Sequence, residues 1–164
     1  MSLKPLLILF ISSGNAARSL IAETLLNAKG SGAYRARSAG TAPLDAIDPD
    51  TKTLLADAGY DVHKLHPKKW QDFHAAAHLV PVDMIVTLSP EARDLIPLDW
   101  VGDPVRAHWV VDDPLGCERV EMREWKLRKC FSTLDARINT LVRCRPTASQ
   151  SEWLLRLKEI GMVV

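Results

Sequence analysis

The residues best suited to chemistry lie in the segment 12–19, which follows a short apolar run and precedes a helical pattern. A loop between a buried strand and a helix presents backbone N–H groups at the positive end of the helix dipole, which favours an anion. Gly14 and Asn15 tolerate the left-handed backbone that such a loop needs. Arg18 can bind two oxygens of one anion with its planar guanidinium group. We therefore expect an oxyanion to be bound by Ser12, Ser13, Gly14, Asn15, Ala16, Ala17, Arg18 and Ser19.

The same segment also fits a simpler interpretation, an ordinary strand-to-helix loop with a capping residue and a solvated arginine. It contains neither a P-loop lysine nor a dinucleotide-binding glycine pattern, which argues against a nucleotide ligand. A second candidate is Asp113, which follows the apolar run 105–111 and precedes Pro114. Its carboxyl group would face the segment 12–19 across the sheet edge, although Asp-Pro by itself favours a turn.

The hydrophobic pattern predicts the parallel sheet that would bring these residues together. Three apolar runs bounded by turn residues are typical of buried strands: 5–11, 84–88 and 105–111. Residues 33–38 alternate in polarity, which suits an edge strand. The predicted fold class is therefore α/β, a four-stranded parallel sheet with helices on both faces and an oxyanion loop after the first strand.

Helical patterns with clear start and stop signals separate these strands. Helices are predicted over residues 18–29, 48–59, 70–77, 118–142 and 153–160, with a short one that begins at Ser89. No linker or internal repeat divides the chain. We expect one domain over residues 1–144, followed by a helical extension over 145–164 that docks onto it.

Composition limits the partners. Twenty-one Lys and Arg against twenty Asp and Glu give a net charge of +1, so any anion recognition must be local and we expect no nucleic acid or membrane partner. The basic segment 63–69 fits either a rim for an acidic ligand or a solvated loop. Cys117, Cys130 and Cys144 match neither a closed disulfide set nor a zinc spacing, which favours a reducing, cytoplasmic location. We expect no metal and no cofactor.

Several short motifs occur in a fixed order along the chain. They are residues 9–11, Gly14-Asn15, Arg18-Ser19 and Ala22-Glu23, then 38–41 and 83–87, then His108-Trp109 with Asp113-Pro114. Together they resemble the low-molecular-weight protein tyrosine phosphatases and the arsenate reductases that share their fold, the last motif favouring the reductase branch. The resemblance covers residues 5 to about 142 and implies the low-molecular-weight phosphatase fold.

The resemblance also implies a mechanism. A cysteine thiolate at the start of the loop attacks phosphorus or arsenic, an arginine holds the oxyanion and an aspartate protonates the leaving group. Arg18 and Asp113 occupy the last two positions; Asn15 would brace the loop and Ser19 would donate a hydrogen bond toward the nucleophile. The nucleophile position, however, holds Ser12. A serine hydroxyl stays protonated without an adjacent base, so we expect little or no turnover.

The reductase branch uses further cysteines to resolve the arsenic adduct, and the resemblance places them near positions 89 and 96. Those positions hold Ser89, a suitable N-cap before a proline, and Ile96. Among the cysteines, Cys117 is the one that could lie near the site, whereas Cys130 falls close to the apolar stripe of the long helix. A working reductase would also need thioredoxin or glutaredoxin as a partner.

Three hypotheses follow for the function. The first is a family member that binds a small oxyanion or phosphorylated ligand without turnover, a pseudoenzyme. The second is an arsenate reductase or protein tyrosine phosphatase inactivated by an engineered change at position 12. The third is a divergent enzyme that uses Ser12 or Cys117. The absence of cysteine at positions 89 and 96 as well as at 12 favours the first.

Overall fold

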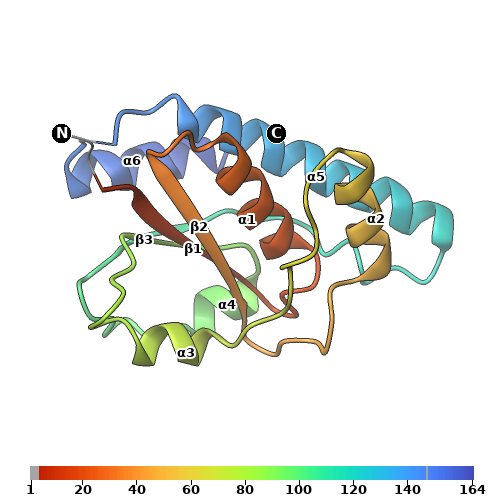
Figure 1. The fold of residues 1–164 in the computed structure, drawn as a ribbon, viewed down its shortest axis with the longest axis horizontal. Helices are drawn as coiled ribbons and strands as arrows, with labels where there is room; N and C mark the ends of the chain where they lie inside the picture. The colour runs from red at the N-terminus through yellow and green to blue at the C-terminus, as the bar shows by residue number, and fades with distance from the viewer. Residues whose placement is uncertain (1–3, 147) are drawn as a thin grey trace.

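A computed structural model describes residues 4–146 and 148–164 of the chain. Its centre is a four-stranded sheet in the order β2-β1-β3-β4 (Figure 1). The strands are β1 (Leu6–Ser12), β2 (Tyr34–Gly40), β3 (Met84–Thr87) and β4 (Val105–His108). All three strand pairings are parallel, so the carboxyl ends of the strands lie along one edge. The α/β class, the strand number and the edge position of β2 are confirmed.

Helices cover both faces of the sheet, as predicted. Helices α1, α5 and α6 lie on one side and α3 and α4 on the other (Figure 1). The bounds are α1 (Arg18–Lys29), α2 (Pro49–Asp57), α3 (Trp70–Ala75), α4 (Pro90–Leu95), α5 (Val120–Val142) and α6 (Gln150–Ile160). In the described ranges, no helix is both long enough and apolar enough to cross a membrane.

Two hydrophobic clusters, one on each face of the sheet, explain why the sequence of β1 is continuously apolar. Side chains alternate between the faces of a strand, so Ile8 and Phe10 join the larger cluster with α1 and α5. Leu9 and Ile11 join the smaller cluster on the opposite face. All four side chains are fully buried, which fixes the position of the loop that follows the strand.

The last helix, α6, packs onto the domain, as expected for the segment 145–164. Its buried side chains Trp153, Leu157 and Ile160 belong to the larger core cluster. The indole Nε1 of Trp109, itself fully buried, donates a hydrogen bond of 2.8 Å to the Leu157 carbonyl oxygen. The division of the chain after residue 144 stays a prediction.

The fourth strand is shorter than predicted, ending at His108 rather than at residue 111. The N–H groups of Trp109 and Val111 still donate to the carbonyl oxygens of Thr87 and Leu88, at 2.8 and 3.4 Å, but ladder pairing has ended. The Val111 carbonyl oxygen accepts a hydrogen bond from Arg18 of α1 instead. The apolar pattern persists through residues 109–111, so the pattern alone overestimated the strand.

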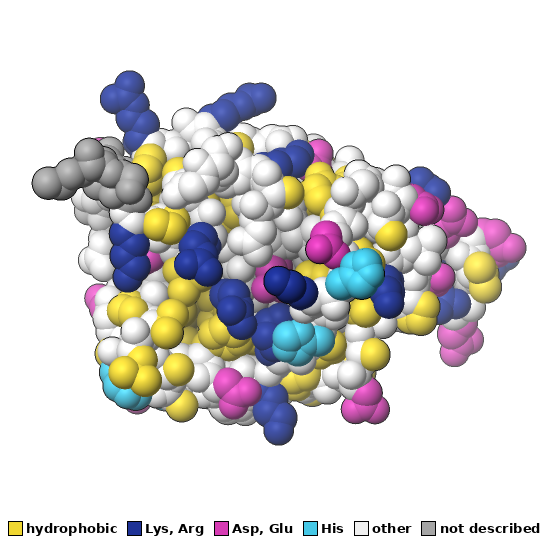
Figure 2. Space-filling model, in the orientation of Figure 1, with side chains coloured by type: hydrophobic (Ala, Val, Ile, Leu, Met, Phe, Trp, Pro, Cys, Tyr) yellow, Lys and Arg dark blue, Asp and Glu magenta, His cyan; other side chains and the backbone are white. Residues whose placement is uncertain are grey.

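Charges of both signs are spread over the surface. On the face drawn in Figure 2, lysine and arginine side chains lie among aspartates and glutamates rather than in one extended field. This distribution agrees with the near-neutral net charge of +1. Long-range attraction of a polyanion is therefore weak, and the local arrangement around the first loop decides what binds there.

Candidate functional site

Backbone hydrogen bonds from the segment that follows β2 fix the conformation of the loop after β1. The carbonyl oxygens of Ser12, Ser13, Gly14 and Ala16 accept hydrogen bonds of 2.9–3.1 Å from the N–H groups of Thr41, Ala42, Leu44 and Asp48. The N–H groups of residues 14–17 make no hydrogen bond to any described part of the chain. Residues 12–18 line a cavity of about 260 Å³. The loop thus combines occupied carbonyls with free amide donors, as an anion site requires.

Asn15 braces this loop. Its φ of 48° lies in the left-handed region, as the sequence indicated, and its side chain is fully buried. The Nδ2 group donates to the hydroxyl oxygens of Ser19 at 2.7 Å and Ser38 at 2.9 Å, while Oδ1 accepts from the Lys68 N–H at 2.8 Å. At Gly14 the φ angle is not positive; a Cβ there would lie 3.2 Å from the Leu44 side chain, so glycine leaves room for that contact.

Gly40, at the end of β2, lies against the backbone of the loop 12–19. A Cβ at this position would lie 2.6 Å from the Ser13 carbonyl oxygen and 3.0 Å from Cβ of Asn15. No real side chain tolerates such a distance to backbone, so only glycine allows this close approach. Gly40 therefore belongs to the framework of the loop.

The two serines that open the loop have different surroundings. Ser12 is 2% exposed, and its Oγ lies 2.6 Å from Oγ of Ser19. Ser13 instead donates at 3.2 Å to both the Ser89 hydroxyl and a carboxylate oxygen of Glu91. A hydrogen bond from the backbone N–H of Glu91 itself, followed by those from the hydroxyls of Ser13 and Ser89, holds the pKa of the Glu91 carboxyl below its ordinary value. No described carboxylate or imidazole contacts the Ser12 hydroxyl.

Arg18 and Asp113 come together across the sheet edge, as expected. Arg18 is 7% exposed, donates from Nη1 to the Val111 carbonyl at 3.1 Å, and has Nη2 3.9 Å from Oδ2 of Asp113. Asp113 also accepts the Leu115 N–H at 3.0 Å and lines the loop cavity. Asp113 thus lies in a turn and also lines the loop cavity, and its role as an acid stays a prediction.

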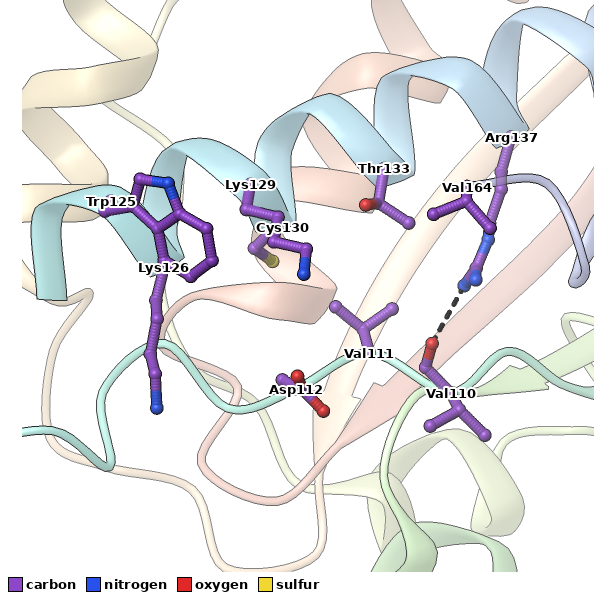
Figure 3. Close-up of a pocket in the computed structure, with 10 residues that line it drawn as sticks. All are labelled: Val110, Val111, Asp112, Trp125, Lys126, Lys129, Cys130, Thr133, Arg137 and Val164. Atoms are coloured by element: carbon purple, nitrogen blue, oxygen red, sulfur yellow. Dashed lines mark hydrogen bonds between the residues drawn. The ribbon is translucent and has the colours of Figure 1, made fainter. Parts of the chain in front are cut away.

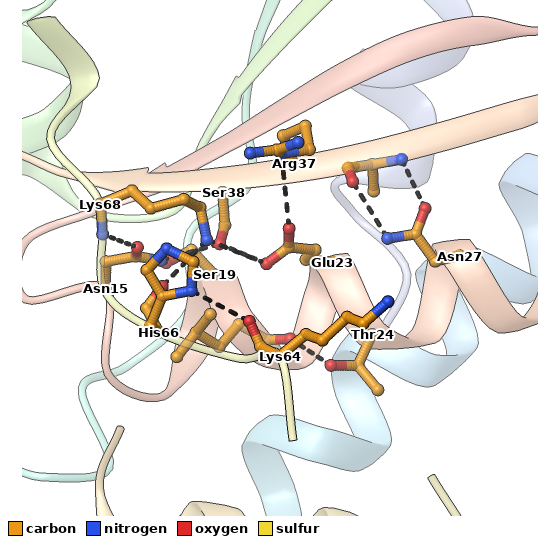
Figure 4. Close-up of polar contacts among 12 residues, drawn as sticks. Asn15, Ser19, Glu23, Thr24, Asn27, Arg37, Ser38, Lys64, His66 and Lys68 are labelled. Atoms are coloured by element: carbon orange, nitrogen blue, oxygen red, sulfur yellow. Dashed lines mark hydrogen bonds and ion pairs between the residues drawn. The ribbon is translucent and has the colours of Figure 1, made fainter. Parts of the chain in front are cut away.

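A buried ion pair behind the loop was missed from the sequence (Figure 4). Oε2 of Glu23 accepts from the Ser38 hydroxyl at 2.7 Å and from Nζ of Lys68 at 3.4 Å. Burial lowers the pKa of Lys68, and the Glu23 carboxylate opposes that shift. The detectable signal was a carboxylate four residues after Ser19, on the same buried face of α1. In the basic segment 63–69, Lys68 points inward rather than forming a rim.

None of the three cysteines lines the loop cavity. Cys117 does not line it, and its thiol contacts only the Arg119 carbonyl. Burial raises the pKa of Cys130 to about 12, which keeps that thiol protonated. Ser89 caps α4 by accepting the Ala92 N–H, as predicted, and Ile96 is buried in the smaller core. The described residues contain no group of three or more His, Cys, Asp or Glu side chains that could hold a metal ion.

Comparison with known proteins agrees with this geometry. Residues 7–150 match the low molecular weight phosphotyrosine protein phosphatase family, and the chain belongs to that family. An arsenate reductase from Archaeoglobus fulgidus is 28% identical with a TM-score of 0.66, over 84% of this chain and 99% of that one. A thioredoxin-dependent arsenate reductase from Corynebacterium glutamicum is 24% identical with a TM-score of 0.66, over 87% of this chain and 63% of that one.

The tyrosine phosphatase Wzb from Escherichia coli K30, in complex with sulphate, has the same fold. It is 18% identical with a TM-score of 0.65, over 84% of this chain and 96% of that one. Reductases and phosphatases thus share the architecture. The fold alone does not choose between them, so the side chains of this particular loop decide the function.

Proposed function

We propose that this protein binds a phosphate-like oxyanion in the loop 12–19 and does not turn it over. The observation that carries the proposal is the set of free amide donors at residues 14–17, next to the nearly buried guanidinium of Arg18. Amide donors and a guanidinium group in a partly enclosed cavity suit a tetrahedral anion. Within the family, this is the binding half of the phosphatase apparatus.

The cavity favours a small ligand. Beyond the loop and Asp113, its walls are Ala42, Leu44 and Leu115, which are aliphatic. No aromatic side chain among the described residues lines it, so nothing there stacks against a phosphotyrosine ring. Arg18 needs only to turn Nη2 away from Asp113, a contact of 3.9 Å, to meet an anion. Inorganic phosphate, or a phosphoryl group on a slim carrier, fits these walls.

The absence of turnover follows from Ser12. A hydroxyl becomes a nucleophile only when a neighbouring base removes its proton. The partner of the Ser12 hydroxyl is another hydroxyl, Ser19 at 2.6 Å. Asp113 lies on the Arg18 side of the cavity, where it would protonate a leaving group rather than activate Ser12. The residues that hold an anion are therefore present without a means of attacking it.

The positions of the cysteines do not support arsenate reduction. A reductase cycle passes through thiol–disulfide exchange, and the Corynebacterium glutamicum relative is thioredoxin-dependent. Here positions 12, 89 and 96 hold no cysteine, and Cys117 does not line the loop cavity. We infer that neither thioredoxin nor glutaredoxin is a catalytic partner of this chain.

Thermal unfolding with and without phosphate tests the binding. Phosphate should raise the Tm of the wild type, because it binds only the folded state. Arg18→Ala removes charge-assisted hydrogen bonds of about 1.5–3 kcal/mol each, so phosphate affinity should fall about tenfold or more. Arg35→Ala removes the same charge from an exposed position on β2 and is the control. Equal phosphate stabilisation of wild type and Arg18→Ala would refute the site.

An aryl phosphate assay tests the lack of turnover. The wild type should release phenol no faster than Ser12→Ala, because neither chain has an activated nucleophile. A burst of phenol in the wild type that disappears in Ser12→Ala would show that Ser12 does attack. In that case the binding proposal would stand and the claim of inactivity would fall.

A further inference from the structure

A second cavity, of about 170 Å³, lies between α5 and the segment 110–112 (Figure 3). Residues Lys126, Lys129, Cys130, Thr133 and Arg137 line it from α5, and Asp112 lines it from the opposite side. It shares no lining residue with the loop cavity in the described ranges. We propose that this α5 cavity binds a second small dianionic oxyanion, such as phosphate or sulfate, independently of the loop.

Arg137 gives the first reason. Its side chain is 5% exposed; Nε donates to the Val163 carbonyl at 3.0 Å and Nη1 to the Val110 carbonyl at 3.1 Å. Neither partner carries a charge, and no described carboxylate oxygen lies within 4.0 Å of the guanidinium. A buried charge without a counter-charge is costly, and an anion in the cavity would offset that cost.

The remaining nitrogen of Arg137 is available for that anion. Nη2 makes no hydrogen bond within residues 4–146 and 148–164, and it is still accessible to solvent. The two carbonyl contacts fix the plane of the guanidinium beside the cavity, as Figure 3 shows for Val110. The donor is therefore held in place before any ligand arrives, which reduces the entropy lost on binding.

Charge around the cavity gives the second reason. Lys126 and Lys129 belong to no ion pair in the described residues, and Nζ of Lys129 lies 5.2 Å above the Trp125 ring at the cavity mouth. Three cations, Lys126, Lys129 and Arg137, outnumber the carboxylates, which are Asp112 and the α-carboxylate of Val164, so the local charge is +1. A net positive charge favours an anion, and donors from separate positions along a helix suit a tetrahedral group.

One residue lies between the α5 cavity and the loop site. Val111 lines the α5 cavity, while its carbonyl oxygen accepts from Arg18 on the other side. Occupation of the α5 cavity would therefore affect the segment that carries Asp113. The two cavities share no lining residue in the described ranges, so the two proposals are tested separately.

The experiment titrates Arg18→Ala protein with inorganic phosphate, because that variant weakens the loop site. Trp125 lines the mouth of the α5 cavity, and its indole N–H signal in a ¹⁵N NMR spectrum, assigned with Trp125→Phe, is the local probe. We expect a saturable shift of this signal, and the same with sulfate. Acetate should bind more weakly, because it carries a single charge.

Variants identify the residues responsible. Lys126→Gln/Lys129→Gln should weaken phosphate binding at Trp125 about tenfold, through loss of two cations, of which Lys126 is half-buried and Lys129 exposed. Arg128→Gln/Arg143→Gln removes the same charge from exposed positions of α5 and its end that do not line the cavity, and should leave binding intact. Asp112→Asn should tighten it, because the one opposing side-chain carboxylate is gone.

Four results would overturn the α5 site. One is a Trp125 shift that grows linearly with phosphate without saturating. Another is equal weakening by the test and control pairs, which would show a general charge effect. The third is acetate binding as tight as phosphate binding. A silent Trp125 in a wild type whose loop signals do respond would refute this site alone, whereas the reverse would refute only the loop.

Discussion

Nζ of Lys68 lies 3.4 Å from Oε2 of Glu23, with side chains 11% and 10% exposed. From Glu23 a chain of hydrogen bonds runs through Ser38, Asn15 and Ser19 to the hydroxyl of Ser12. The ion pair therefore supports the loop from behind, although it touches no ligand in the cavity.

Glu23→Gln should destabilise the fold and weaken the loop. The substitution leaves Lys68 buried without its acidic partner, which costs about 1–3 kcal/mol. Because Ser38 loses a charged acceptor, Asn15 should be held less firmly and phosphate affinity should fall. Urea unfolding and a phosphate titration measure the two effects.

Arg37→Gln is the matched control for that change. Arg37 lies 4.0 Å from the other oxygen of Glu23, but its side chain is 51% exposed. Exposed pairs contribute about 0–1 kcal/mol, so this variant should stay close to wild type. If both variants lose equal stability, the Lys68 contact has no special role.

Gly40→Ala should damage the loop more than its small size suggests. The new Cβ would meet the Ser13 carbonyl at 2.6 Å, and backbone must move to relieve the contact. We expect a loss of about 1–3 kcal/mol of stability and of most phosphate affinity. At Gly116 a Cβ would meet nothing nearer than 3.8 Å, so Gly116→Ala should leave the stability unchanged. Wild-type phosphate affinity in Gly40→Ala would contradict this account.

Much of this arrangement could be predicted from the sequence because it depends on local signals. The alternation of faces along β1 and the free amides after it follow from a buried strand that runs into a helix. The pairing of Arg18 with Asp113 was expected from the family resemblance and the shared edge of a parallel sheet. Such relations need only the order of the elements.

The parts that were missed depend on long-range geometry. Nothing in the segment 63–69 indicates that Lys68, unlike its neighbours, turns inward to a carboxylate 45 residues earlier. The end of β4 was also misplaced, because Trp109 and Val111 are buried in the core without ladder pairing, while Val110 between them is 60% exposed. An apolar pattern alone does not distinguish a strand from an irregular packed segment.

Leu157→Ala should test how firmly the terminal helix belongs to the domain. Leu157 is fully buried in the main core, and removing such a side chain typically costs about 2–5 kcal/mol. Leu154, three residues earlier on α6, is 52% exposed, so Leu154→Ala should cost little. Chemical denaturation with a single cooperative transition would show one unit. If Leu157→Ala causes no loss, α6 would be a loosely attached extension.

His108 should make stability depend on pH. Burial lowers the pKa of His108, and the nearby Arg93 charge lowers it further. The unfolded chain therefore takes up the proton first as the pH falls below about 6.5, and the folded state loses stability until its own lower pKa is reached. His108→Gln should flatten this part of the stability profile. His66→Gln, on an exposed loop, should not. A wild-type profile that rises on acidification would contradict the shift.

Ser12→Cys should restore chemistry to the loop. The free amides of residues 14–17 and the Arg18 charge favour a thiolate, so the pKa of the new thiol should fall well below about 8.5. Ser19, 2.6 Å from the present hydroxyl, can donate a hydrogen bond to that thiolate. With Asp113 next to Arg18, hydrolysis of an aryl phosphate should appear, and it should show a burst of phenol.

Adding Asp113→Asn to Ser12→Cys then tests the acid. General acid catalysis is typically worth about 10²–10⁴-fold, so the double variant should lose most of the restored rate. Arsenate reduction by Ser12→Cys should be much weaker than its aryl phosphate hydrolysis, because Ser89 and Ile96 provide no resolving thiol at those positions. Sustained thioredoxin-coupled arsenate turnover that Cys117→Ser abolishes would instead make Cys117 the resolving residue. A folded Ser12→Cys protein that binds phosphate yet hydrolyses nothing would mean that the acid segment has diverged, and that the domain is a binding module even with its thiol restored.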